Sequence, residues 1–155
     1  MKIVIGVDPG ANGALVAWFN DDKPVIHKFA KTDPCDAITD ILMCTESHAA
    51  GCVAYVEEVS GFIGKPQPGS AMFKFGRSFG YVLGLLRGMN ISTVLVRPQA
   101  WQKGLPGMAS LKGPDRKRAL RDEAARRFPQ VKVTLDNCDA LLLAQYGQRM
   151  ERGSQ

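Results

Sequence analysis

Four carboxylates stand where apolar segments of the sequence begin or end, and they are Asp8, Glu57, Asp136 and Asp139. Asp8 closes the apolar run IVIGV, and Glu57 closes the run CVAYV. Asp136 and Asp139 are three residues apart at the start of a third apolar segment, so a helix there would place both on one face. If the two apolar runs are neighbouring strands, all four carboxylates converge at one edge of a sheet.

Such a cluster predicts a metal site, because carboxylates repel one another unless a cation neutralises them. The donors would all be oxygen atoms, since His27 and His48 lie elsewhere in the sequence, and oxygen ligands suit Mg²⁺ or Mn²⁺. Two such ions about 4 Å apart are a common means of hydrolysing phosphodiesters. One ion activates water and the other stabilises the leaving 3′-oxygen. The four acids therefore predict a hydrolase site that holds two ions.

Each acid also has a purely structural explanation. An Asp before Pro-Gly is often a turn residue, as Asp8 would be. Asp136 would serve as a helix N-cap, with Asp139 favouring the helix dipole from the first turn. Glu57 and its neighbour Glu58 would be surface charges, and they face opposite sides of a strand, so spacing alone does not choose between them. The combination of all the acids with a basic segment favours the metal site.

The elements that must position these acids follow from hydrophobic periodicity and turn residues. An antiparallel meander of three strands comes first, and strands alternating with helices follow, in the order βββαβαβαα. This order is typical of an α/β fold with a five-stranded mixed sheet and helices on both faces. The strands are expected at 2–8, 13–20, 24–30, 52–58 and 91–97. The helices are expected to open at Asp33–Pro34, to cover 71–88 with Ser70 as cap, to turn briefly from Pro98, and to cover 115–128 and 136–150.

The length and composition favour a single globular domain. The chain has 155 residues, of which 45% are hydrophobic, and we expect one domain at 1–150 with a short tail at 151–155. No apolar run reaches the roughly 20 residues of a membrane helix, and the start is too short for a signal peptide. Four scattered cysteines without a C-x-x-C pair are typical of reduced thiols. We therefore expect a cytoplasmic protein with no membrane partner.

The net charge of +5 is concentrated in one segment. Residues 103–127 contain eight basic and three acidic residues, a surplus equal to that of the whole chain. A local basic patch favours a polyanion as partner. The candidate phosphate-binding residues are Lys112, Arg116, Lys117 and Arg118. Lys117 is the candidate for stabilising transition-state charge at a scissile phosphate, although a basic helix can also be a plain solvated surface.

The helix expected at 71–88 carries an unusual stripe of glycines. Gly76, Gly80, Gly84 and Gly88 recur every fourth residue and so share one face. Such a stripe suggests that another backbone approaches closely, and the remaining faces are apolar. We interpret this helix as a homodimer interface formed by Phe73, Gly76, Gly80 and Gly84. A fully buried central helix is the alternative.

Three motifs resemble the RuvC-type Holliday junction resolvases, in the bacteriophage and organellar branch of that family. IGVDPGANGALVAW is similar to their first motif, AYVEEV to their second, and DNCDALLLAQYG to their last. The second match selects Glu57 as the ligand. The stretches SAMFKFGRSFGYVLGLL and VRPQAWQKGL extend the resemblance over nearly the whole chain. It implies a ribonuclease H-like fold, a homodimer, and Mg²⁺-dependent nicking of branched DNA in a bacterial or phage-infected cell.

The resemblance also implies an aromatic side chain that wedges into the DNA junction. Phe62 is the candidate, and Phe73 and Phe75 come next, although a place in the core is the alternative for those two. Further expected DNA contacts are Lys65, Lys74 and Arg77. The chain departs from the family at Asn137–Cys138, where small residues are usual, but thiols are poor Mg²⁺ ligands.

Other functions remain open at this point. The same fold with these acids would also suit a nuclease that cuts flaps, forks or RNA, because junction shape is read by loops and by the dimer. A module that binds branched DNA without cutting is a further possibility, which the intact set of acids disfavours. Sugar kinases and actin-like ATPases share the D-x-G opening, but they need two such domains and lack the D-x-x-D-A helix. We therefore expect no nucleotide cofactor.

Overall fold

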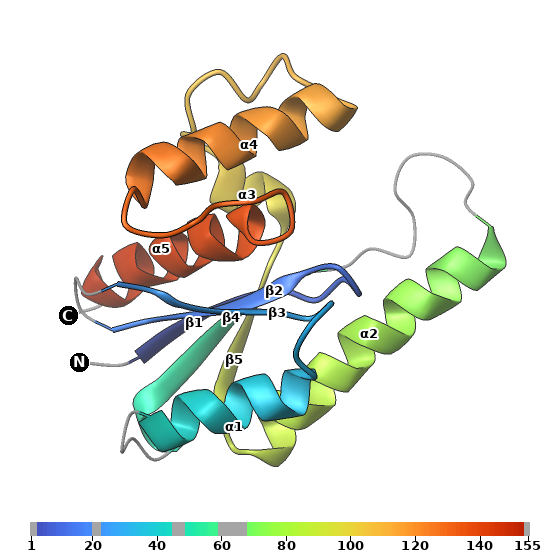
Figure 1. Ribbon diagram of the computed structural model, residues 1–155, viewed down its shortest axis with the longest axis vertical. Coiled ribbons are helices and arrows are strands. Elements are labelled where there is room, and N and C mark those ends of the chain that lie inside the picture. The colour runs from blue at the N-terminus through green and yellow to red at the C-terminus, as the bar shows by residue number, and fades with distance from the viewer. Residues whose placement is uncertain (1–2, 20–22, 45–48, 59–67, 154–155) are drawn as a thin grey trace.

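The computed structural model describes residues 3–19, 23–44, 49–58 and 68–153, and it confirms a five-stranded mixed sheet with helices on both faces (Figure 1). In chain order the elements are β1 (Ile3–Asp8), β2 (Ala14–Trp18), β3 (Val25–Lys28), α1 (Pro34–Cys44), the 3₁₀ turn Ala49–Gly51, β4 (Cys52–Glu57), α2 (Gly69–Gly88), β5 (Ser92–Val96), α3 (Pro98–Gln102), α4 (Gly113–Arg127) and α5 (Cys138–Gly153).

The strands lie in the order β3-β2-β1-β4-β5. The first three are antiparallel, while β1, β4 and β5 run parallel to one another. Val7 is paired with Val56, so the two residues that follow them, Asp8 and Glu57, end neighbouring parallel strands at the same height. The expected neighbourhood of these two strands is thereby confirmed.

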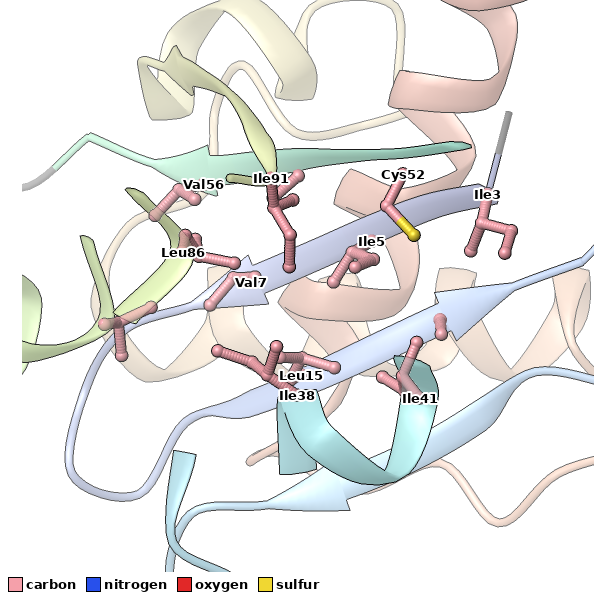
Figure 2. Close-up of a cluster of buried hydrophobic side chains, with 13 residues drawn as sticks. Ile3, Ile5, Val7, Leu15, Ile38, Ile41, Cys52, Val56, Leu86 and Ile91 are labelled. Carbon is pink, nitrogen blue, oxygen red and sulfur yellow. The ribbon is translucent and has the colours of Figure 1, made fainter. Parts of the chain in front are cut away.

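Alternation along β1 separates two cores. Ile3, Ile5 and Val7 pack in one cluster with residues of α1 and α2, and Figure 2 shows Val7 next to Leu86 of α2. Val4 points to the other face, which α3, α4 and α5 cover (Figure 1). Side chains alternate along a strand, so Asp8 faces the same side of the sheet as Val4 does. Its carboxylate therefore lies on the face that α5 covers.

A glycine in β1 lets α5 approach the sheet. A Cβ atom built on Gly6 would collide with the carbonyl of Ala140 and would lie 2.5 Å from the backbone nitrogen of Ala144. The helix backbone therefore rests directly on the strand backbone, a close approach of the kind that glycine permits. This contact brings the start of α5 against the end of β1, where two of the predicted acids lie.

Several boundaries differ from the expected ones. Helix α2 begins at Gly69 after Pro68 without a side-chain cap, so the expectation that Ser70 caps it was wrong. Helix α5 begins at Cys138 and reaches Gly153, so Asp136 lies in the preceding turn and not in the helix. Asp33 does precede α1 as expected, and its Oδ1 accepts a hydrogen bond from the N–H of Cys35 at 2.8 Å.

The glycine stripe of α2 is exposed. A Cβ atom on Gly76, Gly80 or Gly84 would meet no atom of the described residues within 4 Å, and the side chain of Phe73 is 72% exposed. Part of α2 extends beyond the sheet (Figure 1). The alternative of a fully buried central helix was therefore wrong, and so was a place in the core for Phe73. Among the described helices, none is long and apolar enough to cross a membrane.

Candidate active site

Asp8 and Glu57 occupy the carboxyl ends of the two central parallel strands. The Oδ1 atom of Asp8 accepts a hydrogen bond from the N–H of Gly10 at 3.2 Å, so Asp8 also plays the turn role that its Pro-Gly sequence predicts. Burial, together with repulsion from Asp139, raises the pKa of Asp8. A carboxylate held in this way has lost much of its hydration and gains from any nearby cation.

The fold resolves the choice between the two neighbouring glutamates. Glu57 interacts with Asp8 and Asp139, whereas Glu58 points away and accepts a hydrogen bond from Arg97 Nε at 3.2 Å. Burial raises the pKa of Glu57 to about 8, and repulsion from Asp8 adds to this effect. Glu57 Oε2 is buried without a hydrogen-bond partner among the described residues. Glu57, and not Glu58, therefore belongs to the carboxylate cluster.

Asp139 reaches the same place from the first turn of α5, and Lys117 of α4 meets it there. Lys117 Nζ donates a short hydrogen bond to Asp139 Oδ2. Burial acts to lower the pKa of Lys117, but the attraction of Asp139 and of Asp8 outweighs it, so the pKa is raised. The lysine stays protonated and supplies positive charge to the cluster. Its side chain is therefore not part of a plain solvated helix face.

Asp136 stands at the margin of the cluster. Its side chain is 47% exposed and is paired with Lys28 of β3 at 3.5 Å, although its charge still acts on Asp8. The preceding turn is shaped by Asn137, whose Oδ1 accepts a hydrogen bond from the N–H of Thr134 at 2.7 Å. Asn137 thus has a structural role at the position where the resemblance expects a small residue.

The thiol of Cys138 lies next to the cluster, where it donates a hydrogen bond to Asp139 Oδ1 at 3.3 Å. Its side chain is buried, and burial together with the charge of Asp139 raises the pKa of the thiol to about 12. The thiol is therefore protonated at neutral pH. A protonated thiol is not a metal ligand.

Trp101 is a neighbour of the cluster that periodicity alone did not indicate. It lies in α3 and is 1% exposed, and the proximity of its indole N–H helps to lower the pKa of Glu57. The contact falls short of full hydrogen-bond geometry, because Trp101 Nε1 and Glu57 Oε2 both lack a partner in the described part of the chain. One feature of the sequence could have indicated that Trp101 lies near Glu57. Trp101 follows Pro98 by three residues, in the segment that comes immediately after β5, the strand next to β4.

The donor set fits a hard divalent cation. As they stand, the described acidic, histidine and cysteine side chains do not form a ready-made metal-binding group of three or more. Three carboxylates nevertheless repel one another at the end of a stiff sheet, and an unpartnered buried oxygen of Glu57 lies among them. A divalent cation would relieve both conditions, and carboxylate oxygens are its preferred ligands.

The predicted DNA contacts lie in different surroundings. Lys112 is exposed at the start of α4, Arg118 is paired with Asp115 at 3.4 Å, and Arg116 has a buried Nε without a partner in the described chain. Lys74 is exposed on α2. Arg77 lines a cavity of about 470 Å³ beside the Pro9–Ala11 turn.

The three aromatic candidates for the wedge differ in how the structure treats them. Phe73 is exposed, and Phe75 is half-buried with its ring near Gly10. Phe62, the first candidate, lies outside the described residues. The expected DNA contact Lys65 lies outside them too.

The architecture matches two solved structures of one protein. "Thermus thermophilus RuvC structure" aligns with a TM-score of 0.60 at 17% identity, covering 97% of each chain. "T. thermophilus RuvC in complex with Holliday junction substrate" aligns with a TM-score of 0.63 at 16% identity, covering 99% of this chain and 97% of the other. The chain has the RuvC fold. No family model and no curated protein sequence matches it, so the RuvC likeness is one of fold.

Proposed function

We propose that this chain is a metal-dependent endonuclease that resolves four-way DNA junctions by paired nicks. The observation that carries the proposal is the buried cluster of Asp8, Glu57 and Asp139, with Lys117 bonded to Asp139, at the carboxyl ends of β1 and β4 in a RuvC fold. The RuvC that aligns with 99% of this chain was solved with a Holliday junction substrate. A nuclease acting on DNA branches would work in the cytoplasm of a bacterial or phage-infected cell.

The four predicted acids would hold two Mg²⁺ or Mn²⁺ ions, which activate water and stabilise the leaving 3′-oxygen when bound. Asp8 and Glu57 are carried by the ends of β1 and β4, so a rigid sheet backbone holds both of them. Asp139 is carried by α5, and Asp136 by the turn before it. Asp136 would join the set by exchanging its exposed pairing with Lys28 for the metal.

Lys117 would act on the substrate itself. Its ammonium group bonds Asp139 and is attracted by Asp8, so it lies where the scissile phosphate must approach the carboxylates. Positive charge at that place stabilises the charge that develops on the phosphate in the transition state. Lys112, Arg116 and Arg118, on the same helix or at its start, would bind neighbouring phosphates and orient the strand.

Paired nicks require two active sites related by a twofold axis, and hence a homodimer. The exposed face of α2, with Phe73 and the open glycines Gly76, Gly80 and Gly84, is the surface we assign to the second copy. A backbone can approach these glycines closely because no side chain of the described residues covers them. Two copies joined there would present two carboxylate clusters to one junction.

The test compares labelled synthetic substrates, namely a four-way junction, a three-way fork, a flap, a linear duplex and the RNA form of the junction. Each is incubated with Mg²⁺, Mn²⁺ or Ca²⁺ and with the wild type or Asp8→Asn. We expect symmetric nicks in the DNA junction with Mg²⁺ or Mn²⁺. The loss of one metal-holding carboxylate should slow cleavage by roughly 100-fold or more.

The other outcomes separate the alternatives. Equal cutting of flaps and forks would make the chain a general branch nuclease that uses the same carboxylates. Cutting of the RNA junction alone would change the substrate class. Tight binding to the DNA junction without cutting under any metal would replace the proposal with a binding module.

A further inference from the structure

A second concave surface lies beyond Asp136, and it is basic. This groove has a volume of about 570 Å³, and its lining includes four lysines, which are Lys23, Lys28, Lys31 and Lys132. Its other described lining residues are neutral, and none of them is a carboxylate. Lys28 is offset by its pairing with Asp136, whereas the charges of Lys23, Lys31 and Lys132 repel one another on this shared concave surface, so a bound polyanion would stabilise the arrangement.

The groove is built from segments that are far apart in sequence. Lys28 ends β3, and Lys31 belongs to the turn after it, where its N–H donates to the carbonyl of Lys28 at 2.9 Å. Lys132 comes from the connection between α4 and α5, where its carbonyl accepts a hydrogen bond from Asn137 Nδ2 at 3.1 Å. Tertiary structure alone assembles the patch, which lies outside the basic segment 103–127.

The sheet register connects this groove to the carboxylate cluster. Asp8 is paired with Ala14, and Ala14 is paired with Lys28, so the three residues form one row across β1, β2 and β3. Neighbouring strands are about 4.8 Å apart, which puts the backbones of Asp8 and Lys28 roughly 10 Å apart. A nucleic-acid strand carries a charge about every 3.4 Å of helix axis, so a strand cut at Asp8 has further phosphates within that span.

Lys28 joins the two sites physically. Its side chain is 26% exposed and donates to Thr134 Oγ1 at 2.7 Å while it is paired with Asp136 at 3.5 Å. Its ammonium group therefore has a defined position between the groove and a predicted metal-holding carboxylate. Lys23, Lys31 and Lys132 are more exposed, and each can meet a phosphate with little desolvation.

We infer that the groove lined by Lys23, Lys28, Lys31 and Lys132 binds the backbone phosphates of the DNA strand next to the scissile phosphate. This inference rests on the proposed nuclease function and names the surface that positions its substrate. The contacts are made to phosphates, so they confer affinity and register and no sequence preference. The basic helix α4 would contact the strand at Lys117, and the groove would contact it on the other side of Asp8.

The test uses a double variant, Lys31→Ala with Lys132→Ala, which leaves Lys28 and all proposed active-site residues intact. The matched control, Arg87→Ala with Arg149→Ala, removes the same charge from exposed positions on α2 and at the far end of α5. Binding to a labelled four-way DNA junction is measured without divalent metal over a series of salt concentrations. Each lost phosphate contact should reduce the slope of log K against log [salt] by about 0.7 to 0.9.

We expect the double variant to lose about 1.4 to 1.8 of slope and the control to match the wild type. Replacing single phosphates beside the cleavage position by uncharged methylphosphonates should weaken wild-type binding at the groove positions and leave the double variant unaffected there. Equal slopes for the double variant and the control would overturn the inference while leaving the nuclease intact. A wild type that cuts no DNA and binds no junction would instead overturn the proposed function, and the inference with it.

Discussion

At the scale of single residues, the carboxylate cluster brings like charges together in a buried position, and burial disfavours the charged form of each group. Glu57 shows this most clearly, because burial and the repulsion of Asp8 and Asp139 all raise its pKa, to about 8. Lys117 offsets part of the repulsion from its position against Asp139. Such a cluster is costly to the metal-free fold, as expected of residues retained for chemistry.

Glu57→Gln should therefore stabilise the metal-free protein at neutral and alkaline pH. The pKa of Glu57 in the folded chain, about 8, lies above the ordinary 4.5, so the folded state binds this proton more tightly than the unfolded state does. The stability of the wild type falls as pH rises from about 4.5 to 8, and the variant lacks this loss. One pKa unit is worth about 1.4 kcal/mol, so we expect the melting temperature to rise by at least about 3 °C at pH 8.

Thermal melts between pH 4.5 and 9, in EDTA, measure this difference. Glu58→Gln is the control, because Glu58 is the adjacent residue but is directed at Arg97 instead of the cluster. A constant difference between Glu57→Gln and the wild type at every pH would contradict the argument. So would an equal gain in Glu58→Gln.

At the scale of elements, the site depends on how closely α5 packs on β1. Gly6 permits this contact, and Asp139 in the first turn of the helix thereby reaches the end of the strand. Helix α2 has the opposite character, because its glycines face open space. Glycines in this chain thus serve two different surfaces, one inside the fold and one outside it.

Gly6→Ala should destabilise the fold and displace α5, which carries Asp139. The new methyl group would collide with the backbone of α5 at Ala140 and Ala144, and a rigid backbone cannot yield as a side chain can. Overpacking of this kind costs about 1 to 3 kcal/mol. Gly88→Ala is the matched control, because its methyl group would meet no atom of the described residues within 4 Å and Gly88 lies outside the surface assigned to the second copy, so helix stability should rise by up to about 1 kcal/mol. Urea unfolding measures both, and equal effects would contradict the packing argument.

Gly80→Lys should convert the proposed dimer into a monomer without unfolding it. The Cβ atom of a lysine at this position would meet nothing within 4 Å among the described residues, but the lysine would place a long charged side chain between two closely approaching helices. Sedimentation velocity measures the change in mass, and circular dichroism verifies the fold. Ala125→Lys, on the exposed side of α4, serves as the control and should leave the assembly state of the wild type unchanged. Dimers that persist in Gly80→Lys would move the interface to another surface.

At the scale of the whole molecule, cations reach the carboxylates from two separate elements. The chain carries a net charge of +5, and Lys117 of α4 bonds Asp139 while Lys28 at the end of β3 is paired with Asp136. In the proposed nuclease, these cations would attract a nucleic-acid strand, and bound metal ions would offset the carboxylates that otherwise repel its phosphates. Binding of DNA and binding of metal should therefore support each other.

Divalent metal should stabilise the whole fold. A ligand that binds only the folded state adds about 2.7 kcal/mol at 100 times its dissociation constant. That corresponds to a rise in melting temperature of roughly 5 to 10 °C for a chain of this size. We expect Mg²⁺ or Mn²⁺ to have this effect on the wild type but to have little effect on Asp8→Asn. NaCl at equal ionic strength controls for screening, and an equal response to NaCl would contradict a specific metal site.

The sequence by itself determined the order of the elements and the five-stranded mixed sheet, because periodicity and turn residues are local properties. It also determined that Asp8 and Glu57 end neighbouring strands. The carboxyl ends of neighbouring parallel strands lie at the same end of the sheet, so residues that end such strands come close together. The boundaries were less accurate. Ser70 does not cap α2, and Asp136 precedes α5, because helix ends depend on local hydrogen bonds that several residues can satisfy.

Only the tertiary structure decided which charges meet. Spacing left Glu57 and Glu58 equivalent, and the family resemblance selected Glu57. The structure supplies the physical reason, because Glu57 interacts with Asp8 and Asp139 whereas Glu58 is directed at Arg97. The partnership of Lys117 with Asp139 required the packing of α4 on α5, and that of Lys28 with Asp136 joins residues 108 positions apart. Electrostatic interactions act between residues that are close in space. The sequence therefore indicates which charged residues are candidates for the site, and the tertiary structure decides which of them form pairs.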